Sequence, residues 1–221
     1  MNIDKIIRER HSVRSYLDKK IESHKVKILE ELIANINQEH NLHIQLILND
    51  KNTFEKYILH YGKLKNAKNY IALIGKKDKN LHKKIGYYGE MIVLKAQEIG
   101  LNTCWVAGTY HKKSVSASIN SDEELVCIIA IGYGEGNGNT RKSKSISSVS
   151  ISQDAPDWYI KGVEYALLAP TALNEQKFKF EYIKDNTVKA TKGIGPMTKI
   201  DLGIVKYHFE LGANRKINWQ S

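Results

Sequence analysis

Cations and hydroxyl groups are concentrated close to the start of the chain, where residues 8–16 read RERHSVRSY. Arg10, Ser12 and Arg14 alternate in this stretch, so an extended backbone would place their side chains on one side. Two guanidinium groups and a hydroxyl on one side suit a phosphate, which offers several acceptor oxygens. A solvated helix at the N-terminus is the competing interpretation, and the stretch alone favours neither.

A second set of cations follows the apolar run LVCIIAI at residues 125–131. Residues 132–148 read GYGEGNGNTRKSKSISS, with glycines at alternate positions and then Arg141, Lys142 and Lys144. The final glycine of G-x-G-x-x-G is missing and no P-loop occurs, which argues against a Rossmann or P-loop site. Flexible backbone followed by cations can hold a phosphate, but a solvated linker explains the same pattern.

Two carboxamides lie in the stretch APTALNEQKF at residues 169–178. Asn174 and Gln176 can both donate and accept hydrogen bonds, as the pyrimidine edge of a flavin or a base requires. Taken alone, the stretch is a turn that leads into a strand.

Other chemistries lack support. The eight histidines show no metal-ligand spacing, so we expect no metal site. Cys104 is better explained as a small buried residue than as a nucleophile, and no G-x-S-x-G motif is present. We find no obligatory catalytic acid, base or nucleophile.

Helices and strands alternate along the chain, which indicates an α/β or α+β protein. Asp4 can cap a short helix, and Gly100 has the position of a left-handed helix cap. Apolar periodicity predicts helices from about Ser23 and over residues 82–99, 157–168 and 200–213. Alternating or continuous apolar runs predict strands at residues 42–48, 69–74, 125–131 and 177–183, and a short apolar piece at 101–108.

Composition limits the class of protein. The 221 residues suffice for one substantial core or two small domains, and 42% of them are apolar. No apolar run is long enough to span a bilayer, the N-terminus lacks a secretory signal, and there are two cysteines, so we expect a cytoplasmic protein. The net charge of +10 favours solubility, with attraction to polyanions or phosphate ligands as the alternative.

Four segments together resemble the flavin-dependent nitroreductase family. R-x-S-x-R in RHSVRSY is similar to its segment that binds the FMN phosphate, and APTALNEQKF is similar to its A-P-S-x-x-N-x-Q-P-W segment. EIGLNTCWVAG resembles its helix end and strand beside the flavin, and IGYGEGNGNTRKSKS its late strand and basic loop. Lys177 and Phe178 replace the usual proline and tryptophan.

The order of these segments differs from that of typical members, where the A-P-S-x-x-N segment follows the first long helix. Here NLHIQLILND takes that place, and DLGIVKYHFELGA echoes the helix before Gly100. The chain therefore resembles a rearranged, internally duplicated branch. This implies a single α+β domain over residues 1–221, with a central mixed sheet flanked by helices and pseudo-repeated halves at 1–150 and 151–221.

The resemblance also implies a cofactor and a reaction. FMN would be bound, NAD(P)H would donate a hydride to it, and a nitroaromatic, quinone or similar small molecule would accept the electrons, with its proton taken from solvent. The implied cofactor-binding residues are Arg10, His11, Ser12, Arg14, Ala107, Gly108, Arg141, Lys142, Lys144, Pro170, Thr171, Asn174 and Gln176.

Typical relatives are homodimers, although internal duplication would also permit a monomer. Two other functions stay open. One is a flavin-fold protein that binds or senses without turnover. The other is a basic nucleic-acid-binding module in which Tyr87 and Tyr88 stack on bases, but no alternating basic and aromatic face supports it.

Overall fold

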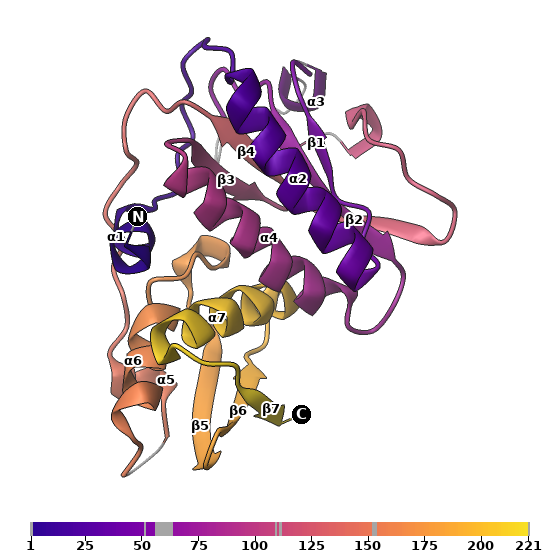
Figure 1. Cartoon of the computed structure of the whole chain (residues 1–221). Coiled ribbons are helices and arrows are strands. Elements are labelled where there is room, and N and C mark those ends of the chain that lie inside the picture. Colours follow the sequence, from indigo (N-terminus) through magenta and orange to yellow (C-terminus); the bar gives the residue numbers. More distant parts are fainter. Residues whose placement is uncertain are drawn as a thin grey trace. The chain divides into compact units, whose positions relative to one another are not determined.

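The computed structural model describes residues 2–50, 52–55, 64–108, 110, 112–151 and 154–220 (Figure 1). The chain forms two compact units. The first unit holds residues 9–81 and 92–140, and the second holds residues 2–8, 82–91 and 141–221. Helix α4 (Leu81–Glu98) thus contributes its first half mainly to the second unit and its second half to the first.

A four-stranded antiparallel sheet organises the first unit, in the order β1-β2-β4-β3. Its other elements are helices. In chain order the unit contains α2 (Ser23–His40), β1 (Gln45–Ile47), α3 (Asn52–Glu55), β2 (Tyr70–Lys76), the end of α4, β3 (Asn102–Val106), a 3₁₀ turn (Lys112–Ser114) and β4 (Glu123–Gly132).

Burial on both faces explains why β4 is apolar from Leu125 to Ile131. Its Cys127 pairs with Leu73 of β2, and its Ala130 pairs with Cys104 of β3. Helix α2 lies over the sheet in Figure 1 and buries the stripe of Leu29, Ile33 and Ile36. Apolar side chains spaced by three and four residues fall on one helix face, so this stripe faces the core.

The second unit combines helices with a three-stranded sheet in the order β5-β6-β7. The β5–β6 pair is antiparallel and the β6–β7 pair is parallel. In chain order the elements are α1 (Ile3–Glu9, of which residues 3–8 belong here), the start of α4, α5 (Ile146–Val149), α6 (Asp157–Ala166), a 3₁₀ turn (Ala172–Asn174), β5 (Phe178–Lys184), β6 (Thr187–Lys192), α7 (Thr198–Ala213) and β7 (Asn218–Gln220).

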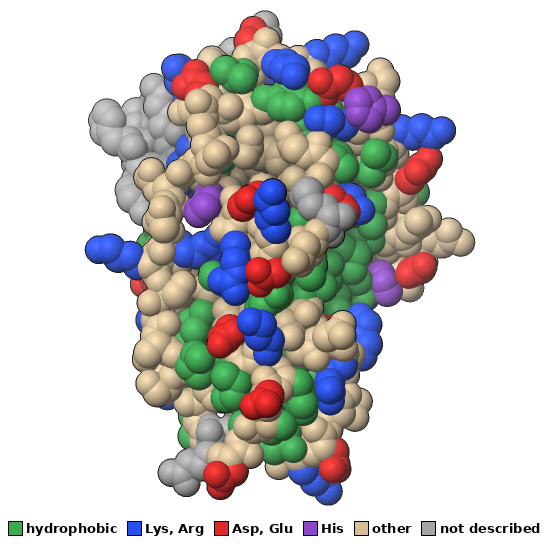
Figure 2. Space-filling model, turned by 60° about the vertical axis from the view of Figure 1, so that its left-hand side comes forward, with side chains coloured by type: hydrophobic (Ala, Val, Ile, Leu, Met, Phe, Trp, Pro, Cys, Tyr) green, Lys and Arg blue, Asp and Glu red, His purple; other side chains and the backbone are tan. Residues whose placement is uncertain are grey.

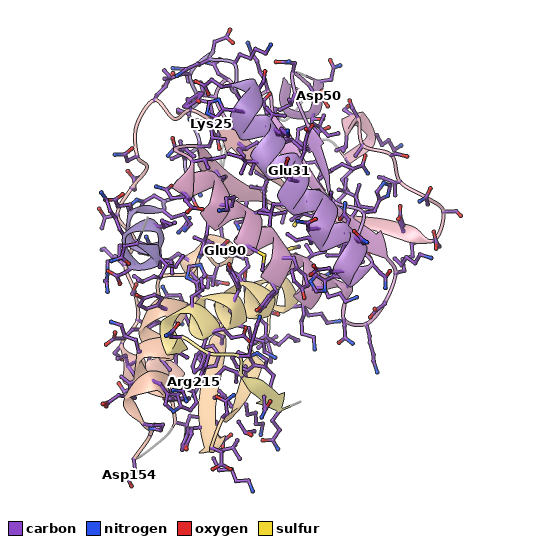
Figure 3. The ribbon with its side chains drawn as sticks, in the orientation of Figure 1. Lys25, Glu31, Asp50, Glu90, Asp154 and Arg215 are labelled. Atoms are coloured by element: carbon purple, nitrogen blue, oxygen red, sulfur yellow. The ribbon has the colours of Figure 1, made fainter. Side chains whose placement is uncertain are left out.

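Glycines let α7 approach the helices around it. A methyl group on Gly86 of α4 would lie 2.1 Å from the Ile200 carbonyl oxygen, and one on Gly203 would lie 2.1 Å from the Lys83 carbonyl oxygen. No side chain fits at such separations, so backbone packs on backbone at this crossing. One turn after Gly86 in α4, Glu90 (labelled in Figure 3) lies 2.8 Å from the Nε2 atom of His208 in α7. Both side chains are fully buried.

The α+β class is confirmed, and so are the helices expected near Ser23 and over 82–99, 157–168 and 200–213. Gly100 has a φ of 76°, as a left-handed cap requires. One expectation is corrected: the strands form two sheets rather than one central mixed sheet. The halves at 1–150 and 151–221 and their internal duplication stay predictions. None of the helices among the described residues combines the length and apolarity of a bilayer span.

Replacing Gly86 or Gly203 with Ala should lower the free energy of unfolding by roughly 1–3 kcal/mol or more, because the methyl group overpacks the α4–α7 crossing. Helix propensity alone would favour Ala by about 1 kcal/mol, so it predicts the opposite sign. Urea denaturation measures the difference. Gly136→Ala is the control, since nothing lies within 4 Å of a methyl group there. Equal stability of all three variants would contradict the close crossing.

Candidate functional site

The predicted site residues are divided between the two units. The first unit contains Arg10, His11, Ser12, Arg14, Ala107 and Gly108. The second unit contains Arg141, Lys142, Lys144, Pro170, Thr171, Asn174 and Gln176. Each group has its own local geometry.

Backbone pairing keeps the stretch after Arg10 extended, which is the one of the two interpretations that turns alternate side chains to the same side. Ser12 forms a parallel bridge with Thr103 of β3, and Tyr16 forms an antiparallel bridge with Gly134. The Val13 amide donates to the Thr103 carbonyl oxygen at 3.0 Å. Residues 10–14 are called the Arg10–Arg14 segment from here on. Through Ser12 and Val13 this segment pairs with the outer side of β3, the edge strand of the sheet.

The alternating side chains of this segment act on one buried atom, the Cys104 sulfur. Burial raises the pKa of the Cys104 thiol, while Arg14, Arg10 and a hydrogen bond with Ser12 each lower it in part. A charge influences a pKa only from nearby, so both guanidinium groups and the Ser12 hydroxyl lie near the Cys104 thiol. Arg10 is buried and Arg14 is exposed, which gives the cluster one fixed and one accessible cation.

Glycine permits the loop after β4 to pack on this segment. Gly138 has a φ of 76°, and a methyl group there would lie 2.9 Å from the Ser12 carbonyl oxygen and 3.0 Å from the His11 Cβ atom. The Gly134 amide donates to the Asn102 Oδ1 atom at 2.9 Å. Close backbone approach thus explains Gly134 and Gly138, without a dinucleotide fingerprint.

The backbone that follows β3 is open. Ala107 is half-buried and Gly108 is exposed, and apart from its chain neighbours no described residue has an atom within 4 Å of a methyl group placed on Gly108. A flat ligand can approach such backbone closely, because no side chain intervenes. His11 is held differently, since its Nδ1 atom lies 2.9 Å from the Glu9 carbonyl oxygen.

In the second unit, both carboxamides hold a loop together. Gln176 is 1% exposed, and its Oε1 atom accepts from the Lys144 amide at 2.8 Å. Its Nε2 atom donates to the Lys142 carbonyl oxygen at 3.3 Å and to the Asn174 Oδ1 atom at 3.2 Å. The Asn174 Nδ2 atom donates to the same Lys142 oxygen at 2.7 Å. Sequence reasoning did not anticipate this internal use of the two amides.

Two of the three basic-loop cations bind protein carbonyls. The Arg141 guanidinium donates to the carbonyl oxygens of Ile7 at 3.3 Å and Arg8 at 3.0 Å, and also to that of Leu168. Arginine commonly satisfies the free carbonyls at a helix end in this way. The Lys144 ammonium donates to the carbonyl oxygens of Glu175 at 2.6 Å and Gln176 at 3.2 Å. The Lys142 side chain is exposed.

Residues 171–176, called the 171–176 turn, have an unusual backbone. Leu173, Asn174 and Gln176 have φ values of 53°, 55° and 48°. Left-handed backbone is unfavourable for a side chain such as that of leucine, so the turn needs anchors. Thr171 provides one, since its Oγ1 atom accepts from the Gln176 amide at 3.1 Å. Pro170, which is half-buried, leads into the turn.

Asp201 is a residue of this region that sequence reasoning missed. It lies in the first turn of α7, is 5% exposed, and accepts a hydrogen bond from the Ala172 amide at 3.1 Å. Burial raises its pKa to about 7; the Ala172 hydrogen bond opposes this shift and the charge of Glu175 adds to it. The signal in the sequence was an acidic residue between the buried apolar residues Ile200 and Leu202.

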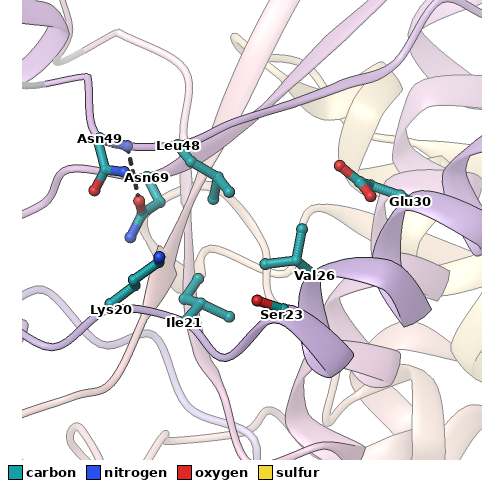
Figure 4. Close-up of a pocket in the computed structure, with 8 residues that line it drawn as sticks. All are labelled: Lys20, Ile21, Ser23, Val26, Glu30, Leu48, Asn49 and Asn69. Carbon is teal, nitrogen blue, oxygen red and sulfur yellow. Dashed lines mark hydrogen bonds between the residues drawn. The ribbon is translucent and has the colours of Figure 1, made fainter.

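A separate hollow of about 260 Å³ lies in the first unit (Figure 4). It is lined by Lys20, Ile21, Ser23, Val26, Glu30, Leu48, Asn49 and Asn69. The Asn49 amide donates to the Asn69 Oδ1 atom at 3.0 Å across one side of it. The predicted site residues do not line this hollow, so it offers them no support.

The surplus of cations is spread over the surface. Figure 2 shows Lys and Arg side chains interspersed with Asp and Glu on the face in view. Several are paired, such as Lys65 with Glu135 at 2.9 Å and Lys161 with Glu164 at 3.0 Å. In the part of the chain that the structure describes, no group of three or more His, Cys, Asp or Glu residues is arranged to hold a metal ion.

Comparison with known proteins places these features in a family. The family model described as "Putative TM nitroreductase" matches residues 2–213. A "putative nitroreductase" from Thermotoga maritima is similar in structure, with a TM-score of 0.68 and 27% identity over 96% of this chain and 83% of that chain. No protein of the curated set matches.

Two further solved structures share the fold at lower identity. One is titled an FMN-dependent nitroreductase from Clostridium difficile, with a TM-score of 0.51 and 20% identity over 62% of this chain and 90% of that chain. The other is titled a "putative NADH oxidase" from Clostridium acetobutylicum, with a TM-score of 0.51 and 21% identity over 67% of this chain and 99% of that chain.

The stability of the protein should fall as the pH rises from about 5 to 7, in part because of Asp201. Its pKa is about 7 in the folded chain and 3.8 ordinarily, so the folded state holds one more proton between these values. Such a group lowers the free energy of unfolding by up to roughly 1.4 kcal/mol per pH unit, and this effect ends above the folded pKa.

Urea denaturation of the wild type and of Asp201→Asn at pH 5, 6, 7 and 8 measures this contribution. The difference between the two curves should change steadily up to about pH 7 and then level off. A constant difference would show that Asp201 does not titrate in this range.

Proposed function

The chain belongs to the family described as "Putative TM nitroreductase", and from this we propose that it is an FMN-dependent oxidoreductase that passes electrons from NAD(P)H to a nitroaromatic, quinone or similar acceptor. The membership gives the reaction class, an oxidoreductase of the nitroreductase kind. The cofactor, the donor and the acceptor are the proposal.

One observation carries the proposal: Arg10, Ser12 and Arg14 belong to one extended segment, and all three side chains lie near the Cys104 thiol. Guanidinium groups bind phosphate oxygens through paired N–H donors, and a hydroxyl adds a third direction. The glycine at 138 keeps the neighbouring loop close to Ser12 without a side chain between them. This donor set fits the phosphate of FMN, which we assign to Arg10, Ser12 and Arg14, with His11 beside it.

The remaining residues of the first unit fit the flat ring of the same cofactor. Ala107 and Gly108 leave their backbone accessible at the end of β3. Backbone N–H groups are good donors to an atom on which negative charge develops, and they need no reorganisation. When bound, FMN supplies the electron transfer itself, while the chain binds and orients it.

The second group receives its roles by resemblance and from its local bonding. We assign Pro170, Thr171 and Asn174 to the surface that faces the flavin or the acceptor. Gln176 belongs to this set by resemblance, and its bonds to Lys142, Lys144 and Asn174 support a role in holding the loop.

The three cations of the basic loop, Arg141, Lys142 and Lys144, also differ in their local bonding. Lys142 has an exposed side chain, so its ammonium can reach an anionic ligand. Arg141 and Lys144 keep their proposed contribution of positive charge, although their donors also bind carbonyl oxygens. We propose that the protein is a homodimer. Internal duplication of the chain would also allow a monomer.

Purified protein mixed with FMN and passed through gel filtration should elute with flavin absorbance. NADH or NADPH should then bleach that absorbance in the absence of oxygen, and a quinone should restore it. Flavin that elutes apart from the protein would overturn the proposal. Bound flavin that neither nicotinamide reduces would leave a binding or sensing protein, and the elution volume reports whether the protein is a dimer.

Arg14→Ala should weaken FMN binding by about 1.5–3 kcal/mol, the scale of a hydrogen bond to a charged group. Quenching of flavin fluorescence measures the affinity. Arg8→Ala is the matched control, because Arg8 lies in the same cationic stretch but its guanidinium pairs with Asp4 at 2.9 Å. Equal affinity of a folded Arg14→Ala variant would remove Arg14 from the phosphate site.

A further inference from the structure

Asp201 is a carboxyl group in an unfavourable place, which calls for a reason. It is 5% exposed in the first turn of α7, and the positive shift of its pKa records the cost of burying its charge. An apolar residue there would continue the buried run from Ile200 to Leu202 without this cost. The carboxyl group of Asp201 accepts a hydrogen bond from the Ala172 amide at 3.1 Å.

Ala172, the hydrogen-bond partner of Asp201, lies near the start of the strained turn. Ala172 precedes Leu173 and Asn174, whose φ values of 53° and 55° lie in the left-handed region. The bond from the Gln176 amide to Thr171 Oγ1 joins the two ends of the turn, and the Gln176 side chain accepts from the Lys144 amide. Asp201 adds a bond that joins the Ala172 amide of the turn to α7.

We propose that Asp201 is a positioning residue of the flavin site: by holding the Ala172 amide it fixes the left-handed turn and so the direction in which Thr171 and Asn174 face a bound flavin. The proposal rests on the proposed function, which assigns those two residues to the ligand. Asp201 itself acts on these residues through its hydrogen bond to the Ala172 amide.

Charge near Asp201 is consistent with an anchoring role rather than an ion pair. Glu175, also in the turn, is the charged group that acts on Asp201, and it repels a carboxylate. Glu175 is in turn paired with Lys177 at 2.8 Å. The acceptor oxygen is thus the useful part of Asp201, and an uncharged acceptor of the same shape should replace it.

This reasoning selects the variants. Asp201→Asn keeps an oxygen that can accept from the Ala172 amide, whereas Asp201→Ala removes it. If Asp201 only stabilised the fold, its loss would affect the whole unit. A positioning role instead predicts that Asp201→Asn restores the order of the 171–176 turn. Asp157→Ala is the control, because Asp157 is an exposed acidic residue in the first turn of another helix of the same unit, α6.

Two measurements on the full chain test the proposal. Hydrogen exchange of the 171–176 amides should be faster by roughly tenfold or more in Asp201→Ala and near wild type in Asp201→Asn and Asp157→Ala. The dissociation constant for FMN should rise roughly tenfold in Asp201→Ala alone, which corresponds to about 1.4 kcal/mol. Agreement of both measurements supports the positioning role.

The opposing outcomes are separable. If the wild type binds no FMN, the proposed function is overturned, and with it any role of Asp201 toward a flavin, whatever the exchange rates are. If the wild type binds FMN and Asp201→Ala binds it equally well, only the role of Asp201 is overturned. If Asp201→Asn fails as badly as Asp201→Ala in both measurements, the acceptor oxygen is not the anchor.

Discussion

Backbone pairing of residues 12–17 is the interaction on which the proposed phosphate site depends. Ser12 pairs with Thr103, Ser15 with Lys65 and Tyr16 with Gly134. These contacts keep the chain extended, and an extended chain turns alternate side chains to the same side. In a helix, residues two apart face different directions, so the two arginines and the serine between them would separate. A few main-chain hydrogen bonds therefore decide whether these three side chains serve one ligand.

Close backbone contact has the corresponding role in the second unit. Gly86 and Gly203 let α4 and α7 meet without side chains between them, and this fixes the first turn of α7, where Asp201 lies. Asp201 then binds the turn that precedes β5. The helix crossing, the carboxyl group and the strained turn form one chain of contacts. Such a chain transmits position because packed backbone is not easily deformed.

Sequence pattern predicted most of the regular elements: the apolar stripe of α2 has the helical period, and the short β-branched run of β4 is typical of a strand buried on both faces. It failed at β6, where the polar stretch TVKATK shows little apolar signal, although Asp185 and Asn186 before it are typical of a hairpin turn. The spacing of Arg10, Ser12 and Arg14 suggested a shared ligand only if the backbone was extended, and it did not decide between that and a helix. The bonds of Gln176 and the anchor at Asp201 could not be predicted, because they join residues that only tertiary structure brings together.

The two cysteines of the chain, Cys104 and Cys127, are 4% and 0% exposed. Thiol-directed reagents react with accessible thiolate, and burial of this degree keeps both sulfur atoms away from such reagents in the folded protein. A cysteine introduced at exposed Gly108, where neighbouring atoms leave the space open, would then be the single thiol ready to take a fluorophore or a spin label. The native protein is thus already suited to site-specific spectroscopy at the end of β3, without removal of its own cysteines.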